Sequence, residues 1–183
     1  MIRRCLLIAV PLVLAAGAAS AEIMITPFAG TSFGGQTQRN VGTYGVGVGF
    51  LGGGVFGFEA EFSWAPDFFG DSATATNTST NHVQSLDFNL LLALPIGVVR
   101  LYGAGGVGVI GSKVTSGLAS FDFSNTNAGF NAGGGLIIGL GKHFGLRGDI
   151  RYFRTFGNLA QTGDFTIQEL DYWRGVGGLV FRF

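Results

Sequence analysis

The residues best suited to chemistry are acidic and arginine side chains that recur at every second position. Glu59 and Glu61 form one pair, and Arg147, Asp149 and Arg151 form a run of three. Residues two apart on a β-strand point to the same face, and carboxylates bind guanidinium groups through strong, often bidentate hydrogen bonds. The spacing therefore predicts an Arg–carboxylate network on one face of a sheet. Four further charges are assigned to it: Asp87, Arg100, Arg174 and Arg182.

A second candidate for chemistry is His82, which has Ser79 and Ser85 nearby and Asp87 beyond them. A histidine that activates a serine and is oriented by a carboxylate is the arrangement of serine hydrolases. A histidine in a Ser/Thr-rich stretch often arises by chance, however. We therefore expect no catalytic residue, and a His82-based enzyme is the least favoured hypothesis.

The segment Gly103 to Gly108 matches the G-x-G-x-x-G fingerprint of dinucleotide-binding proteins. That fingerprint requires a helix to begin within it, because the amides at the helix start hold the pyrophosphate. Val109 to Val114 shows no helical period, so we expect no cofactor. The chain also lacks the Cys/His spacing of a metal site, and we predict no bound metal.

Eight segments of alternating hydrophobicity would position the charged residues. Such segments, about ten residues long and separated by turn residues, are typical of membrane-spanning strands. The connections alternate strictly between short Gly- or Pro-containing turns and longer polar stretches. About 20 residues per strand and connection favour eight strands, and ten strands remain an alternative. The predicted strands are 23–33, 41–51, 55–65, 83–94, 98–111, 130–140, 144–156 and 167–183.

Charges fall on one face of every predicted strand that carries them. In 55–65, for example, Phe58 and Phe62 alternate with Glu59 and Glu61. Turning the charged face outward would place each network arginine in lipid, at a cost of up to about 2–4 kcal/mol at the midplane. We therefore expect the charges to line a lumen. Arg154 is the exception, near the outer rim, where it can reach water.

Aromatic residues lie at two heights along the predicted strands, as expected for the girdles of a transmembrane barrel. One level contains Trp64, Tyr152 and Trp173. The other contains Phe50, Phe56, Phe144, Phe181 and Phe183. These levels favour a membrane protein whose apolar outer face contacts outer-membrane lipid.

Glycines share the lumen face of three predicted strands, and they offer space for the charged side chains. An eight-stranded barrel is only just wide enough to be filled by side chains. Bare strand surface on one side would leave room for arginine and glutamate from the other. The glycines are Gly45, Gly47 and Gly49, then Gly106 and Gly108, then Gly133, Gly135 and Gly139.

Composition and the first residues indicate an exported membrane protein. The chain has 33 glycines, 12% charged residues and a mean hydropathy of +0.42. After residue 21, no run of about 18 apolar residues could form a spanning helix, and closed barrels are the other structures that satisfy every backbone group in lipid. Arg3 and Arg4, the apolar Leu6 to Leu14 and the small residues Ala19 to Ala21 predict a signal peptide over 1–21.

Removal of the signal would leave a barrel domain over 22–183. It would also remove Cys5, the one cysteine, and leave nine Lys+Arg against eleven Asp+Glu. This balance provides no basic surface for nucleic acid. The predicted location is the bacterial outer membrane, reached through a cleaved signal peptide.

The stretch from Glu22 to Phe183 resembles the OmpA/OmpX-type small barrels, within the outer membrane protein beta-barrel domain family. The most specific match is the ending from Gly178 to Phe183, where Leu179, Phe181 and Phe183 alternate with other residues. The resemblance implies recognition of these three residues by the barrel-assembly machinery. No periplasmic peptidoglycan-binding domain is evident, so tethering of the cell wall is not implied.

Three functions follow as hypotheses. The first is a structural or surface-interaction role through extracellular loops, such as 73–81 and the loop containing Phe121 and Phe123. The second, suggested by the family resemblance, is a narrow ion or small-solute channel gated when lumen Arg–carboxylate pairs exchange partners. The third is a lipid A-modifying enzyme that uses His82. We favour the first, because buried ion networks are commonly structural.

Overall fold

The computed structural model describes residues 21–35, 37, 40–66, 80–115, 126–156, 160–162, 165–167 and 170–183. Residues 1–20, most of the predicted signal peptide, lie outside this part, as do Ser79, Phe121 and Phe123. Ala21 is the first residue of the first strand. No helix among the described residues is long and apolar enough to cross a membrane.

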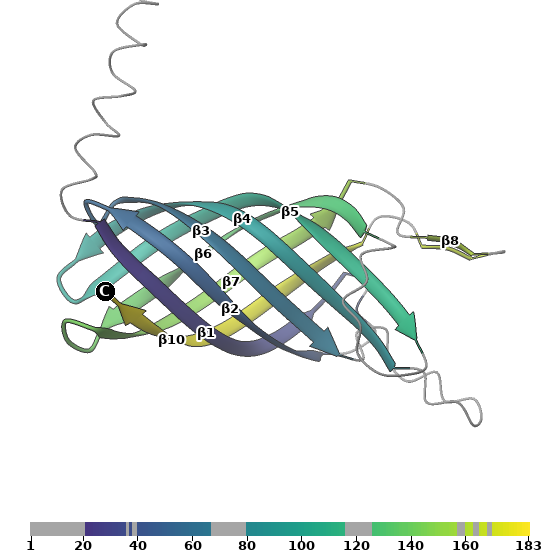
Figure 1. The fold of residues 1–183 in the computed structure, drawn as a ribbon, viewed down its shortest axis with the longest axis horizontal. Coiled ribbons are helices and arrows are strands. Elements are labelled where there is room, and N and C mark those ends of the chain that lie inside the picture. The colour runs from purple at the N-terminus through teal and green to yellow at the C-terminus, as the bar shows by residue number, and fades with distance from the viewer. Residues whose placement is uncertain are drawn as a thin grey trace, which may run out of the picture.

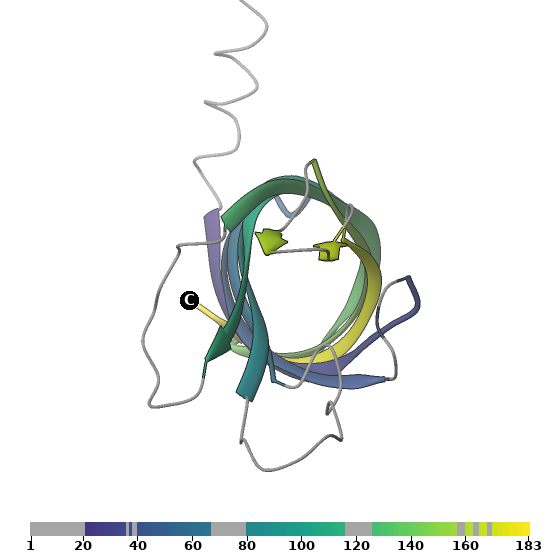
Figure 2. The ribbon, with the colours of Figure 1, turned by 90° about the vertical axis from the view of Figure 1, so that its right-hand side faces the viewer.

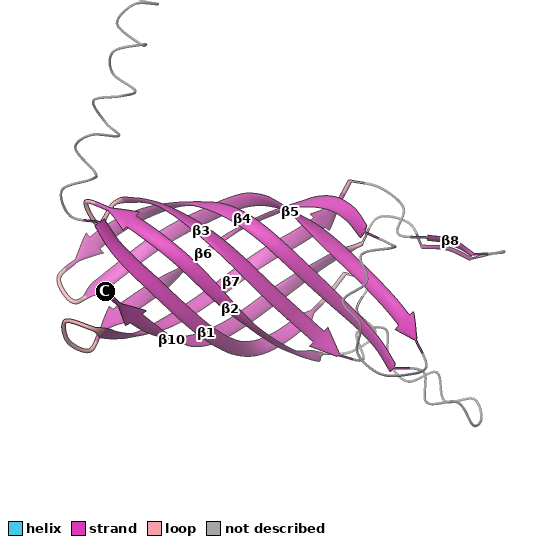
Figure 3. Cartoon of the chain, in the orientation of Figure 1, coloured by secondary structure: helices cyan, strands magenta, loops and turns pink. Residues whose placement is uncertain are grey.

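Eight strands close into one antiparallel barrel, which confirms the predicted strand number (Figures 1 and 3). Their order around the barrel is β1-β10-β7-β6-β5-β4-β3-β2. Figure 2 shows the closed ring of strands from one end. The strands are β1 (Ala21–Phe33), β2 (Val41–Gly52), β3 (Phe56–Pro66), β4 (Thr80–Ile96), β5 (Val99–Thr115), β6 (Thr126–Gly139), β7 (Phe144–Thr155) and β10 (Asp171–Arg182).

The last residue of the chain completes the seam between the first and last strands. β1 pairs with β10 from Met24 opposite Arg182 to Phe33 opposite Trp173. Beyond this register, the backbones of Ile23 and Phe183 exchange hydrogen bonds of 3.3 and 3.0 Å. Closure matters because a barrel has no edge strand, so its backbone groups are paired without water.

Short turns join β2 to β3, β4 to β5 and β6 to β7 at one end of the barrel, which we call the short-turn end. Gly53 and Gly54 have φ values of 59° and 72°, a conformation that glycine adopts without steric cost. The C-terminus lies at the same end (Figure 1). The strand ends that the longer connections join lie at the opposite end of the barrel, called the long-loop end.

Two short strands in the last connection were not predicted. β8 (Ala160–Thr162) and β9 (Phe165–Ile167) form a separate two-stranded sheet. The prediction that the last barrel strand begins at Ile167 is therefore wrong, because Ile167 pairs with Ala160 in that sheet. β10 begins at Asp171, just after Leu170, whose amide donates to the Thr155 hydroxyl at 2.9 Å.

The hairpin of β4 and β5 extends further than its apolar pattern indicated. Its register continues to Thr80 opposite Thr115, beyond the predicted ends at Val83 and Gly111. The added residues are mostly polar, and backbone pairing alone can extend a hairpin there. Hydrophobic alternation detects the part of a strand that faces lipid, so it misses such an extension.

Candidate functional site: the charged lumen

All nine predicted network residues lie on the lumen face of their strands. On β3 and β7, buried and more exposed residues alternate, and the network residues occupy the buried positions, whereas Arg154 of β7 is exposed. The apolar residues between the network residues lie on the outer face; Phe58 on β3 and Leu146 on β7, for example, are 54% and 43% exposed. Seven of the nine are buried: Glu59, Glu61, Asp87, Arg147, Asp149, Arg151 and Arg174. Arg100 and Arg182 are partly exposed.

We call these seven buried residues the central network. Glu59 lies at its centre. Both terminal nitrogens of Arg147 donate to its carboxylate, one of them at 3.2 Å. Arg151 Nη2 donates to Glu59 Oε1 at 2.8 Å. The two arginines come from β7, while Glu59 is on β3, across the lumen from β7. The contact therefore links opposite walls of the barrel.

Tyr102 connects the central network to β5 through Asp149 and Arg147. Arg147 and Arg151 both contact the Asp149 carboxylate, at 3.1 and 2.9 Å. The Tyr102 hydroxyl donates to Asp149 and accepts a hydrogen bond of 2.6 Å from Arg147 Nε. Tyr102 thus has a charged partner both as donor and as acceptor, which offsets the cost of burying its hydroxyl.

Arg174 pairs with Glu61 on the opposite side of the central network. Its Nη2 donates to Glu61 Oε1, and its guanidinium carbon lies 5.1 Å from the ring centre of Phe28 and 4.6 Å from that of Phe153. Arg151 approaches the same glutamate at 3.6 Å. The two rings hold the Arg174 guanidinium beside Glu61 through cation–π contact.

The Asp87 carboxylate forms hydrogen bonds with neutral side chains. Ser85 Oγ donates to its Oδ2 at 2.7 Å, and Asn131 Nδ2 approaches its Oδ1 at 3.4 Å. Asn131 also donates to Asn89 at 2.8 Å. These amides and hydroxyls connect Asp87 to the rest of the central network.

A second ion cluster, the short-turn cluster, consists of Glu22, Arg100 and Arg182. The Glu22 carboxylate contacts Arg100 at 2.8 Å and Arg182 at 3.3 Å. Arg182 also donates to the carbonyls of Gly141 and Phe144 at 2.7 and 2.8 Å. The cluster therefore links four strands, β1, β5, β7 and β10, and the turn between β6 and β7 at the end of the lumen.

Apolar side chains fill the lumen on both sides of the central network. The long-loop layer consists of Val41, Ala65, Val83, Ile110, Phe153, Leu170 and Tyr172. The short-turn layer consists of Met24, Leu51, Leu91, Ala93, Tyr102, Ala104, Ile137 and Val180. The buried charges thus lie between two layers of packed side chains.

Comparison with known proteins identifies the fold family. The family model described as outer membrane protein beta-barrel domain matches residues 6–172. This chain belongs to that family. It is an outer-membrane β-barrel, in agreement with the predicted family and fold.

Solved structures of small outer-membrane barrels resemble this one over nearly their whole length. Neisserial surface protein A has a TM-score of 0.65 at 12% identity, with 90% of this chain and 99% of that chain covered. A major outer membrane protein from Thermus thermophilus has 0.59 at 16%, with 90% and 100% covered. Ail of Yersinia pestis, solved with the heparin analogue sucrose octasulfate, has 0.57 at 14%, with 89% and 98% covered. These identities show a shared fold alone. No curated protein sequence matches the chain.

The predicted girdle residues lie on the outer face of this outer-membrane barrel. Trp64 and Trp173 are each 41% exposed, and the Tyr152 and Trp173 rings are 5.3 Å apart. At the short-turn end, Phe144 contacts Phe181 edge-on at 5.7 Å. Phe183 is 72% exposed. These rings lie on the outer face near both ends of the barrel, and their role as a membrane girdle remains a prediction.

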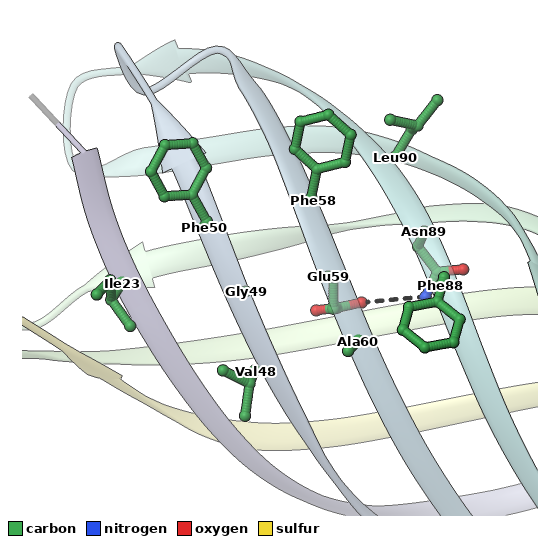
Figure 4. Close-up of a pocket in the computed structure, with 10 residues that line it drawn as sticks. All are labelled: Ile23, Val48, Gly49, Phe50, Phe58, Glu59, Ala60, Phe88, Asn89 and Leu90. Carbon is green, nitrogen blue, oxygen red and sulfur yellow. Dashed lines mark hydrogen bonds between the residues drawn. The ribbon is translucent and has the colours of Figure 1, made fainter. Parts of the chain in front are cut away.

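A shallow groove of about 600 Å³ lies on the same outer face. Figure 4 shows its floor at Ala60, with Val48, Phe58 and Phe88 around it. The small side chain of Ala60 leaves the hollow between its larger neighbours. Glu59 and Asn89 reach the same region from the lumen side, where Asn89 donates to Glu59 at 3.5 Å (Figure 4).

Of the described residues, His82, Ser85 and Asp87 do not form a catalytic set, and Ser79 lies outside the described part of the chain. His82 occupies an outward position on β4 and lies against Trp64, with ring centres 6.5 Å apart. Ser85 and Asp87 are buried on the lumen face of the same strand. Period-two geometry places them on opposite sides of the barrel wall. The G-x-G-x-x-G segment, Gly103 to Gly108, lies wholly within β5.

Sequence reasoning did not assign Glu22, Tyr102, Asn89 or Asn131 to the charge network, although each contacts it. Strand periodicity could have identified Tyr102, because it lies two residues after Arg100 on the same face. Likewise, Asn89 follows Asp87 by two residues. Glu22 lies two residues before Met24 on β1, but the predicted strand began at Ile23. Nothing in the pattern distinguished Asn131 from its neighbours.

Three of the predicted lumen glycines lie close against charged side chains. A Cβ at Gly133 would lie 2.9 Å from the Arg151 side chain, and one at Gly139 would lie 3.0 Å from Arg182. A Cβ at Gly108 would collide with the Asp87 carboxylate. At Gly108 and Gly133 an added Cβ would also meet backbone atoms of the paired strand, so glycine permits the close approach of Asp87 and Arg151 to the neighbouring strand.

Proposed function

We propose that this protein is a non-conducting scaffold of the outer membrane that presents its long loops as an interaction surface. The observation that carries the proposal is the filled lumen: an ion network whose arginines Arg151 and Arg174 are 0% exposed lies between two apolar layers. An eight-stranded barrel is just wide enough to be filled in this way. The interior then stabilises the fold, and the exterior loops carry the binding function.

The energetics of the central network support a closed lumen. Breaking a buried ion pair by removing one partner typically costs about 3–5 kcal/mol. Arg147 and Arg151 share the carboxylates of Glu59 and Asp149, so opening a water path would disrupt several such contacts together. The apolar layers would also have to part.

A channel is the second candidate, and one observation favours it. Arg151 contacts three carboxylates, those of Glu59, Glu61 and Asp149. An arginine shared in this way could exchange partners without ever losing all of them. Exchange alone would leave both apolar layers in place, and for this reason the closed scaffold is the better supported function.

We further propose that the long-loop end faces outside the cell and that residues 1–21 direct export. Transmembrane barrels have short periplasmic turns and longer extracellular loops, and the observed connections alternate in this way. On this orientation, Leu179, Phe181 and Phe183 remain the expected signal for the barrel-assembly machinery. The position of Phe183 at the seam with β1 fits a signal that is read before closure.

Loop charge suggests which ligands are disfavoured. The long connections contain one basic residue, Arg39, and five acidic residues: Asp67, Asp71, Asp122, Asp164 and Glu169. Ail was solved with a heparin analogue, which is a polyanion. An acidic loop surface would repel such a ligand. We therefore propose a neutral or cationic surface partner for this barrel.

Thiol accessibility tests the filled lumen. The expected mature chain contains no cysteine, because Cys5 lies in the predicted signal. Ser63 is 4% exposed in the lumen, whereas Asn40 is exposed between β1 and β2. With a membrane-impermeant thiol reagent, Asn40→Cys should react quickly and Ser63→Cys only after unfolding. Equal reaction rates in the folded barrel would indicate a water-filled lumen and contradict the proposal.

A further inference from the structure

The central network contains one more acid than base. Its carboxyl groups are Glu59, Glu61, Asp87 and Asp149, and its guanidinium groups are Arg147, Arg151 and Arg174. The short-turn cluster has the opposite excess, but the short-turn apolar layer separates the two, and side-chain exposures of 20% and 22% for Arg100 and Glu22 let solvent balance that cluster. An isolated buried charge is very costly, and such a group usually becomes neutral instead.

Three of the four carboxyl groups have arginine partners. Glu59 and Asp149 each contact both Arg147 and Arg151. Glu61 contacts Arg174 and, at 3.6 Å, Arg151. Among the described residues, no arginine nitrogen lies within 4.0 Å of the Asp87 carboxylate, whose polar contacts are Ser85 Oγ at 2.7 Å and Asn131 Nδ2 at 3.4 Å.

Among the described residues, none of the charged groups around Asp87 forms an ion pair with it. From β3, Glu61 lies directly opposite it in the register, which places a second acid beside it. β5 presents Gly108 and β6 presents Asn131. Arg151 of β7 is bound by three other carboxylates. From β10 come the phenol of Tyr172 and the guanidinium of Arg174, which pairs with Glu61 and contacts the rings of Phe28 and Phe153. Arg174 Nε and Nη1 make no hydrogen bond and lie more than 4.0 Å from the Asp87 carboxylate.

We propose that Asp87 is a proton-binding site of the lumen: it keeps its proton in the folded barrel at pH values at which an aspartate of the unfolded chain has lost it, and its ionisation weakens the barrel as the pH rises. The local geometry suits the acid form. A protonated Asp87 can donate to Ser85 Oγ, which in turn can donate to Ser63 Oγ at 2.9 Å. The proton balances the central network without an additional cation.

The sign of the pH dependence distinguishes Asp87 from the other acids. In an unfolded chain, an aspartate ionises near pH 3.9. If the folded barrel retains the proton above that pH, the folded state binds more protons than the unfolded state, and stability falls as the pH rises. The carboxylates paired with arginine act in the opposite direction, because the barrel loses their contribution when acid protonates them.

The test compares urea unfolding of the refolded wild-type barrel and Asp87→Asn in lipid vesicles at pH 5 and pH 8. Asparagine has the shape and neutrality of the protonated acid, so its urea midpoint should exceed that of wild type, with the larger difference at pH 8. Glu59→Gln, which removes a charge held by two arginines, should lower the midpoint at both pH values. Failure of Asp87→Asn to fold, or a midpoint below wild type at pH 8, would overturn the proposal.

Infrared spectroscopy provides a second, independent readout. The folded wild-type barrel at pH 5 should show the carbonyl stretch of a protonated carboxylic acid, and Asp87→Asn should lack it. Absence of that band from wild type, or its persistence in Asp87→Asn, would contradict the assignment. Neither result depends on whether the barrel conducts, so the function proposed above is tested separately.

Discussion

Arg151 shows how a single side chain holds opposite walls of the barrel together. It extends from β7 to Glu59 and Glu61 on β3 and also contacts Asp149 on its own strand. Its side chain is completely buried, so water cannot replace these contacts when one is lost. Buried charges of this kind are costly to leave without a partner.

Removal of Arg151 should therefore destabilise the barrel strongly. We expect Arg151→Ala to lower the free energy of unfolding by about 3–5 kcal/mol, as for other buried pairs that lose one partner. Arg100, whose side chain is 20% exposed, is the matched control. Arg100→Ala should cost about 0–1 kcal/mol. Urea titration in vesicles measures both, and equal losses would show that burial does not govern these pairs.

Glycines on the two faces of β6 and β7 should respond differently to the same substitution. Gly133 faces the lumen, where a Cβ would meet Arg151, while a Cβ at Gly148 on the lipid side has nothing within 4 Å. Gly133→Ala should lower stability, because Arg151 or the backbone must shift. Gly148→Ala should be neutral or stabilise by about 0.4–1 kcal/mol, because alanine reduces the entropy of the unfolded chain. Equivalent urea midpoints for both variants would contradict the assigned faces.

At the scale of elements, strand alternation predicted the barrel well, because each strand must separate lipid from lumen. The ends of β2 and β7 differ from the predicted ends by a single residue. β8 and β9 were missed because three-residue strands show no alternation. The pairs within the network were also beyond the sequence, because Glu59 meets Arg147 across the lumen rather than on a neighbouring strand. Such pairing depends on strand stagger, which periodicity does not reveal.

The last strand provides a prediction about assembly. Phe183 is 72% exposed, so its side chain contributes little packing inside the folded barrel. If Phe183 is read by the assembly machinery, Phe183→Ser should lower the amount of folded barrel in the outer membrane of cells while refolding in vesicles is nearly unchanged. Phe144→Ser, at 58% exposure in the same girdle, is the control and should assemble normally. Equal loss for both variants would point to a lipid effect instead.

At the scale of the whole molecule, the barrel inverts the usual distribution of residue types. Its apolar side chains cover the outside, and its charges are concentrated midway along the lumen. Apolar layers at both ends of the central network complete the interior. This arrangement suits a rigid support for external loops, because the binding surface can vary while the interior stays fixed.

Single-channel conductance of the refolded barrel in a planar bilayer tests the central claim most directly. Wild type should give no discrete current steps, because the two apolar layers and the central network close the lumen. Glu59→Ala should also remain silent, since both layers persist when one ion pair is broken. Folding should be verified on the same preparation by gel migration before and after heating. Discrete steps in wild type that change size or frequency in Glu59→Ala would contradict the closed scaffold and make the central network the gate of a channel.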